Sequence, residues 1–184
     1  MNKIQKRIAA PKPPIAKKGT ISGHAALFNQ KTELMPGVYE MIAPQAFRNT
    51  DFSQAKALFN HDPNKVLASV KAGTLKLTVD EIGLRYEFKM PNTSYGNDLL
   101  EMIRRGDIDQ SSFAFTVTDE GYIPKRVSGK NINVVTEIDK LFDVSPVTYP
   151  AYEQTTVSAR SKQKKIRTTL QEYELFILKQ KALN

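Results

Sequence analysis

The sequence predicts a mainly β domain with peripheral helices, an α+β fold whose sheet is closed or nearly closed. Short stretches of alternating apolar and polar residues recur along the chain, a pattern typical of strands with one buried and one wet face. Turn-forming residues separate these stretches. There is no internal repeat, and the pattern argues against a parallel α/β fold. At 184 residues, the chain is long enough for one domain with a substantial core.

We expect three segments along the chain. Residues 1–19 are predicted to be a flexible basic arm, because prolines in this segment fix φ and remove backbone hydrogen-bond donors. The domain itself is predicted to span residues 20–158. Residues 159–184 are predicted to be a basic, helical C-terminal tail with one apolar side. The apolar positions of that side are Ile166, Leu170, Tyr173 and Ile177.

The clearest strand signal lies in residues 75–90. Two alternating stretches flank the turn-forming sequence "DEIG" at 80–83, which predicts an antiparallel hairpin with one wet face. Residues 20–30 begin with a shorter β-like alternation, and residues 37–47 follow a Pro-Gly turn signal. Two apolar runs surround the polar sequence "NHDPN" at 60–64, where proline disfavours a helix through this point.

One helix is predicted in residues 93–106. Thr93 or Ser94 is a capping candidate at its start, and Gly106 follows two arginines at its end. A strand is expected directly after the helix, and two more are expected in residues 127–152.

The formal charge of +8 is carried by the two ends of the chain. Residues 1–19 carry +6 and residues 160–184 carry +5, which leaves −3 of the total for the segment between them. A mildly acidic domain argues against DNA or RNA binding as the main task. The basic ends are interpreted as solvated termini, and they alone could contact nucleic acid or an acidic partner.

Cysteine is absent, and no run of eighteen apolar residues occurs. The first fact excludes disulfides, thiolate nucleophiles and cysteine-based metal sites. The second predicts that the chain has no membrane span. Because the N-terminus also lacks the apolar centre of a secretory signal, we expect a soluble chain that is not exported.

Two adjacent serines in the sequence "RRGDIDQSSFAFTV", residues 104–117, are predicted to have different surroundings. Side chains alternate between the two faces of a strand, so Ser111 lies on the same face as Phe113 and Phe115. Ser112 points the other way, and we expect its face to border a cleft or solvent. Ser112 is therefore the better candidate for a nucleophile.

A serine hydroxyl needs a base within hydrogen-bond reach, and histidine is the usual base. Of the two histidines, His61 lies in the polar break, where an exposed loop or strand end suits a catalytic group. His24 lies in an apolar stretch and is interpreted as a packed or surface residue. These residues alone leave a chance pairing of Ser112 and His61 open. A metal site at His61 and Asp62 is disfavoured because adjacent side chains of an extended chain point apart, and we expect no metal and no cofactor.

Three blocks of the sequence together resemble the phage prohead maturation proteases of the HK97 type. They are "ALFNHDPNKVLA" (57–68), "GDIDQSSFAF" (106–115) and "LFDVSPVTYPAYEQT" (141–155), and "GHAALFN" and "YEMIAPQAF" also match the start of that family. The resemblance covers about residues 20–158. It implies a serine protease domain with a β-barrel core and surrounding helices, similar to the herpesvirus maturation proteases.

The resemblance also implies the roles of three residues. The histidine of the family falls on His61, and its serine, usually in Met-Ser-Phe-Gly-Phe, falls on Ser112 with Ser111 in the methionine position. The family commonly has Glu-Val-Ser where this chain has Asp-Val-Ser, so Asp143 becomes the candidate for orienting His61. A solvent-exposed carboxylate on an edge strand is the alternative interpretation of Asp143. The oxyanion hole stays unassigned.

The predicted function is therefore that of a serine endopeptidase acting inside the assembling phage procapsid in the host cytoplasm. Its implied substrates and partners are scaffold segments and N-terminal segments of the major capsid protein, together with its own tails. One alternative is a non-catalytic capsid-assembly module that binds scaffold, and another is a DNA-binding protein. Cleavage specificity and the formation of homo-oligomers are left open by the sequence.

Overall fold

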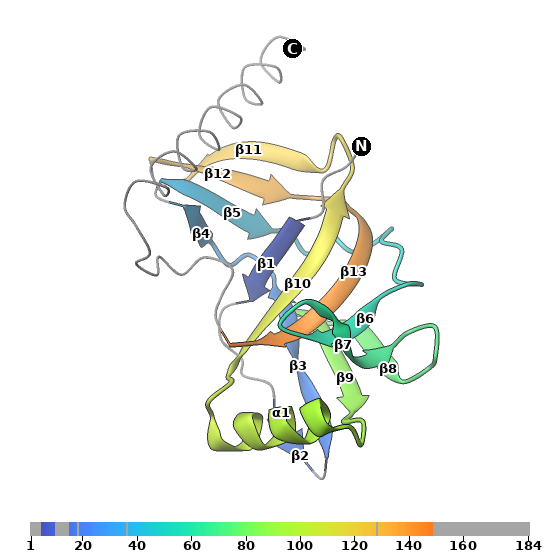
Figure 1. The fold of residues 1–184 in the computed structure, drawn as a ribbon. Helices are drawn as coiled ribbons and strands as arrows, with labels where there is room; N and C mark the ends of the chain where they lie inside the picture. The colour runs from blue at the N-terminus through green and yellow to red at the C-terminus, as the bar shows by residue number, and fades with distance from the viewer. Residues whose placement is uncertain (1–4, 10–14, 18, 36, 128, 149–184) are drawn as a thin grey trace. The chain divides into compact units, whose positions relative to one another are not determined.

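We describe the fold from a computed structural model, whose described residues are 5–9, 15–17, 19–35, 37–127 and 129–148 (Figure 1). These residues form thirteen strands and one helix, which confirms a mainly β, α+β fold. The expected tail, residues 159–184, lies outside them. The elements are β1 (Gln5–Ala9), β2 (Ile15–Lys17), β3 (Thr20–Leu27), β4 (Thr32–Met35), β5 (Val38–Ile42), β6 (Lys56–Phe59), β7 (Asp62–Ser69), β8 (Leu75–Val79), β9 (Gly83–Lys89), α1 (Ser94–Arg105), β10 (Gln110–Val117), β11 (Tyr122–Val127), β12 (Lys130–Val135) and β13 (Ile138–Val147).

The strands pair into three sheets. The largest has the order β1-β10-β13-β6-β7, and the two smaller ones have the orders β11-β12-β5-β4 and β2-β3-β9-β8. Within the largest sheet β10 is antiparallel to both β1 and β13, whereas β6 is parallel to β13. Figure 1 shows β10 running between β1 and β13.

The expected closed or nearly closed barrel is not supported by this pairing. Each of the three sheets is open among the described residues, and the largest ends at β1 on one side and at β7 on the other. Within the part of the chain that the structure describes, α1 is the single helix, where we expected several peripheral helices. Alternation in a sequence predicts which face of a strand is buried, but it does not predict which strands become partners.

The described residues of the expected flexible arm include two strands. In residues 1–19, β1 pairs with β10 and β2 pairs with β3, so these parts of the segment belong to the sheets. Strand pairing uses backbone N–H and C=O groups, which basic residues supply as well as any others. The charge of the segment therefore gave no sign of this pairing.

The hairpin and the helix predicted from the sequence are confirmed. Strand β8 pairs antiparallel with β9, and their register places Leu75 opposite Phe88. Thr93 caps α1 by accepting a hydrogen bond from the backbone N–H of Gly96 at 3.1 Å. Gly106 ends the helix with a φ of 84°, a left-handed conformation that glycine adopts without steric cost. Strand β11 was missed, because its internal proline disfavours a strand assignment.

The core packs against one face of β10. Phe113 and Phe115 stack with ring centroids 4.8 Å apart, and both are buried. On the same face, the buried hydroxyl groups of Ser111 and Tyr86 share a hydrogen bond of 2.8 Å. Burial raises the pKa of Tyr86, so its phenol stays neutral. The predicted core position of Ser111 is therefore confirmed.

The Tyr86–Ser111 hydrogen bond predicts a non-additive pair of substitutions. Tyr86→Phe should lower the free energy of unfolding by about 1–2 kcal/mol, because it leaves the buried hydroxyl of Ser111 without this partner. Tyr86→Phe combined with Ser111→Ala should cost less than the two single changes added together, since both polar groups are then removed. Urea unfolding of the four proteins measures the coupling, and strictly additive costs would contradict it.

Candidate active site

The turn between β6 and β7 holds two consecutive residues in the left-handed conformation. Asn60 has a φ of 56° and His61 a φ of 57°, and the flanking residues Phe59 and Asp62 pair with each other across the turn. Positive φ at both central positions is the requirement of a type I′ hairpin turn. Asparagine and histidine tolerate this conformation better than most residues other than glycine. Pro63 follows on β7, an edge strand where a missing N–H is tolerated.

Asn60 ties this turn to the end of β13. Its side-chain amide donates to Thr148 Oγ1 at 3.0 Å, and its side-chain oxygen accepts from the backbone N–H of Thr148 at 2.8 Å. The backbone N–H of Asn60 also donates to the carbonyl oxygen of Pro146 at 3.1 Å. Three hydrogen bonds thus fix the residue that precedes His61. We call this set the Asn60 clamp.

His61 lies between the other two candidate residues and contacts both. Its Nδ1 atom is 2.6 Å from Asp143 Oδ1, and its Nε2 atom is 2.7 Å from Ser112 Oγ. The structure therefore brings His61, Ser112 and Asp143, which are far apart in the sequence, into one chain of hydrogen bonds.

Sheet order explains how these residues meet. Ser112 lies on β10 and Asp143 on the neighbouring β13, two rungs apart in the ladder: Ser112 faces Ser145, and Ala114 faces Asp143. The next strand is β6, whose C-terminal turn carries His61. Two adjacent strands and the turn that follows the third thus supply one residue each.

Ser145 is a fourth polar member of the site, which the sequence interpretation did not assign. Its hydroxyl donates to Asp143 Oδ1 at 2.6 Å, and its side chain is buried. Asp143 and Ser145 are two residues apart on a strand, so their side chains share a face. The sequence Asp-Val-Ser could have predicted this contact, because alternation along a strand places the side chains of Asp143 and Ser145 on the same face.

The site is more enclosed than we expected. Ser112 has an exposed fraction of 0% and Asp143 of 5%, although we expected Ser112 to face a cleft or solvent and kept open a solvent-exposed Asp143. Both faces of β10 are buried. Side-chain parity identifies which face a residue occupies, but whether a second layer covers that face depends on the rest of the chain.

The hydrogen-bonding capacities of these groups define the state of the imidazole. An ionised carboxylate can only accept hydrogen bonds, so the proton between Asp143 and His61 lies on Nδ1 of His61. In a neutral imidazole with its proton on Nδ1, Nε2 is unprotonated and accepts from the hydroxyl of Ser112. This arrangement places a base next to a serine hydroxyl, with a carboxylate holding the base in the required tautomer.

The other histidine, His24, lies on β3 in a different sheet and is buried, so of its two interpretations, packed or surface residue, the structure supports the first. Its Nε2 atom is 2.9 Å from Asp80 Oδ2. Burial raises the pKa of Asp80, but hydrogen bonds from His24 and from the backbone N–H groups of Gly83 and Ile82 outweigh it and hold the pKa below its usual value. These contacts hold the turn between β8 and β9.

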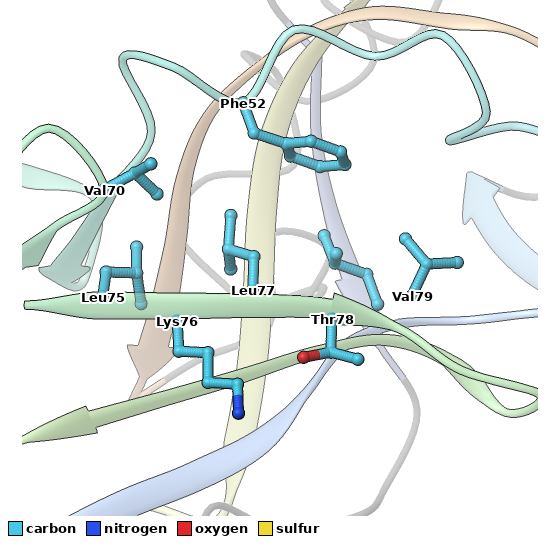
Figure 2. A pocket seen from close by; sticks show the side chains of 8 residues that line it. Phe52, Val70, Leu75, Lys76, Leu77, Thr78 and Val79 are labelled. Carbon is cyan, nitrogen blue, oxygen red and sulfur yellow. The ribbon is translucent and has the colours of Figure 1, made fainter. Parts of the chain in front are cut away.

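A pocket lies beside β8, and its lining includes none of His61, Ser112 and Asp143. It is lined largely by apolar side chains, and Figure 2 shows Lys76 and Thr78 pointing away from the others. The lining residues are Phe52, Val70, Leu75, Lys76, Leu77, Thr78, Val79 and Leu84. Among the described residues, no group of three or more His, Cys, Asp or Glu side chains could hold a metal ion. In the same part of the chain, no helix is long and apolar enough to cross a membrane.

Comparison with known proteins gave one family and one solved structure. The model of the caudovirus prohead serine protease family matches residues 7–172. The structure of the bacteriophage T4 capsid assembly protease is similar over 78% of this chain and 99% of its own, with 12% sequence identity and a TM-score of 0.43. No curated protein matches the sequence.

The Asn60 clamp predicts that the position of His61 depends on Asn60. Asn60→Gly keeps the left-handed conformation accessible but removes both side-chain hydrogen bonds to Thr148. We expect the rate at which Ser112 reacts with a serine-directed phosphonate to fall by about tenfold to a hundredfold, because small displacements of a base are costly. Asn29→Gly is the control, since Asn29 has the same φ of 56° in another turn. Equal rates in the two variants would disprove the role of the clamp.

Proposed function

This chain belongs to the caudovirus prohead serine protease family, and we propose that it is a serine endopeptidase in which Ser112 is the nucleophile, His61 the general base and acid, and Asp143 the residue that orients His61. The observation that carries the proposal is the continuous set of hydrogen bonds from Ser112 Oγ through His61 to Asp143, with distances of 2.7 and 2.6 Å. The family match covers the positions of all three residues.

The proposed reaction proceeds by acyl transfer. Ser112 Oγ attacks the carbonyl carbon of the scissile peptide bond while Nε2 of His61 takes the hydroxyl proton. His61 then gives this proton to the leaving amine, the C–N bond breaks, and an acyl ester remains on Ser112. Water attacks the ester with His61 again as the base, which releases a carboxylic acid product and regenerates the hydroxyl of Ser112. Asp143 stabilises the imidazolium formed in each half of the cycle.

Ser145 and the Asn60 clamp support this mechanism. Ser145 restrains the carboxylate of Asp143, and the clamp restrains the turn that carries His61. Asp143 Oδ1 accepts from both His61 and Ser145, so two donors restrain the carboxylate. Charge-assisted hydrogen bonds of this kind are among the stronger ones in proteins. The alternative function is that of a non-catalytic capsid-assembly module. Such a module would not need hydrogen bonds that connect a serine to a histidine and the histidine to a carboxylate.

We propose that the substrates are scaffold segments and N-terminal segments of the major capsid protein, cleaved inside the procapsid within the host. The family supports this proposal, because its description is that of a prohead serine protease. Cleavage of the protease's own tails belongs to the same proposal, because chain ends are accessible to proteolysis. Assignment to the HK97 type, and the kinship with herpesvirus maturation proteases that it implies, are proposals that rest on the three sequence blocks.

The assignment of the nucleophile predicts opposite behaviour of the two adjacent serines. Ser112→Ala should abolish scaffold cleavage and phosphonate labelling, whereas Ser111→Ala should retain both because its side chain lies in the core beside Tyr86. Mass mapping of the labelled wild-type protein should place the phosphonate on Ser112. The assignment is wrong if both variants, folded as judged by circular dichroism, lose activity equally.

The orienting role predicts a large effect of an isosteric change. Asp143→Asn should lower the rate of peptide cleavage on the order of a thousandfold or more, because an amide can donate to Nδ1 and so favour the wrong imidazole tautomer. Asp139→Asn is a matched control on the same strand, where the carboxylate accepts from Thr116 at 3.2 Å. A loss of less than tenfold in Asp143→Asn, with an unchanged melting temperature, would exclude this role for Asp143.

A further inference from the structure

Strand β8 lies at the edge of its sheet. Among the described residues it pairs with β9 alone, and its register with β9 has no bulge. Its sequence contains no proline, and its one charged residue is Lys76. Proline and bulges are two of the features that keep edge strands from pairing with other chains. The outer edge of β8 is therefore regular and can accept a further strand.

The alternation of hydrogen bonds identifies the backbone groups at this edge. The backbone N–H of Asp80 donates to the carbonyl oxygen of Gly83 at 3.0 Å, so these residues form a hydrogen-bonded pair. Hydrogen-bonded and non-hydrogen-bonded pairs alternate along an antiparallel ladder, and β8 therefore bonds to β9 through Lys76 and Thr78. The other residues of the strand direct their N–H and C=O groups away from β9. They are Leu75, Leu77 and Val79.

The side chains of β8 form an apolar face and a polar face. Leu75, Leu77 and Val79 lie along the pocket beside the strand, whereas Lys76 and Thr78 point away from the other lining residues (Figure 2). Val79 is 44% exposed, which makes it one of the few large apolar side chains left open to solvent among the described residues. A second strand with the same alternation would extend the apolar face and cover Val79.

The charges at the two ends of β8 are opposite. Lys71 and Lys76 lie toward its N-terminal end and are exposed, whereas Asp80 and the exposed Glu81 follow its C-terminal end. An antiparallel strand of the same sequence would bring the basic end of each copy to the acidic end of the other. A parallel strand would place like charges together, which is unfavourable. The charge distribution therefore fits a second copy of β8 in the antiparallel direction.

We propose that this edge is an interface between two copies of the chain, in which two β8 strands pair antiparallel about a two-fold axis with Leu77 opposite Leu77. This register joins the outward backbone groups of the two strands along their whole length. It places Lys76 opposite Thr78 of the second copy, so no like charges lie directly opposite each other. The same surface is used by both copies, and the assembly therefore closes at two. The inference does not depend on the proposed function, because β8 belongs to a different sheet from Ser112 and Asp143.

Other two-fold registers satisfy fewer of these conditions. A shift of two residues in one direction pairs only residues 75–77 and places Lys76 opposite Lys76, where like charges repel. The same shift in the other direction pairs only residues 77–79 and places Thr78 opposite Thr78. A shift of one residue would join outward groups to groups already bonded to β9. The register centred on Leu77 is the most complete.

Engineered cysteines test this register, because the chain contains none of its own. Residues 76 and 78 of opposite copies would form a non-hydrogen-bonded pair, whose Cα atoms lie about 4.5 Å apart, a distance that a disulfide spans. With oxidised glutathione as the oxidant, Lys76→Cys/Thr78→Cys should form covalent dimers at least about tenfold faster than Lys76→Cys or Thr78→Cys alone, because pairing gives the two thiols a millimolar effective concentration. Dimers are measured on non-reducing gels. Equal rates in the double variant and either single variant would overturn the inference.

A proline at position 79 tests the backbone hydrogen bonds of the interface. Val79→Pro removes an N–H that points toward the open edge and leaves the bonds to β9 in place. Val79→Ala is the matched control, because it shortens the same side chain and keeps the N–H. The full-length proteins are compared by sedimentation velocity over a series of concentrations, and circular dichroism shows that each is folded.

We expect the mass of the wild-type protein to rise with concentration toward twice that of one chain. Two five-residue strands form a small interface beside the about 1,200–2,000 Å² of stable complexes, so the dimer should be reversible. Val79→Pro should weaken the association at least about tenfold, since the two-fold axis doubles the loss of a hydrogen bond. Val79→Ala should weaken it less. A wild-type protein that stays a single chain at every concentration, or equal weakening by the two variants, would overturn the inference.

Discussion

The hydrogen bond between His61 and Asp143 is the interaction on which the site depends, because it connects a turn to β13, the strand that pairs with the strand of Ser112. Asp143 is fixed by β13, which is paired with β10 on one side and β6 on the other. His61 has no such support, since it lies on a two-residue turn. The bond of 2.6 Å to Asp143 Oδ1 transfers the rigidity of the sheet to the imidazole.

This position of His61 requires an unfavourable backbone conformation, with positive φ at both Asn60 and His61. Two consecutive left-handed residues other than glycine each cost about 1–3 kcal/mol when nothing compensates for them, although asparagine and histidine lie at the low end of this range. The Asn60 clamp and the bond from His61 to Asp143 supply the compensation. Glycine at both positions would remove the strain but also the base and its support. The strained turn is thus a consequence of placing a histidine side chain at the end of a tight hairpin.

Much of this site could be predicted from local sequence patterns, and the remainder depended on long-range pairing. Alternation assigned Ser111 to the core and Ser112 to the opposite face, and the hairpin and helix followed from turn and capping residues. The resemblance selected Asp143. The alternation of side chains from Asp143 to Ser145 would also have predicted the contact between them, but this prediction was not made. The pairing of β1 with β10 could not be predicted, because backbone hydrogen bonds leave little trace in side-chain identity. The open sheets were missed for the same reason, since partner choice is not encoded in a single strand.

The two adjacent serines make the register of β10 decisive. A slip of one residue would present Ser111 to His61 and turn the aromatic residues Phe113 and Phe115 toward the site, because side chains alternate with a period of two. A serine would still face the base after such a slip, so the chemistry of the site by itself would not select the register. The core selects it: the stacked rings of Phe113 and Phe115 and the buried hydrogen bond from Ser111 to Tyr86 exist in one register only. Which of the two serines faces His61 is therefore determined by packing on the opposite face of β10.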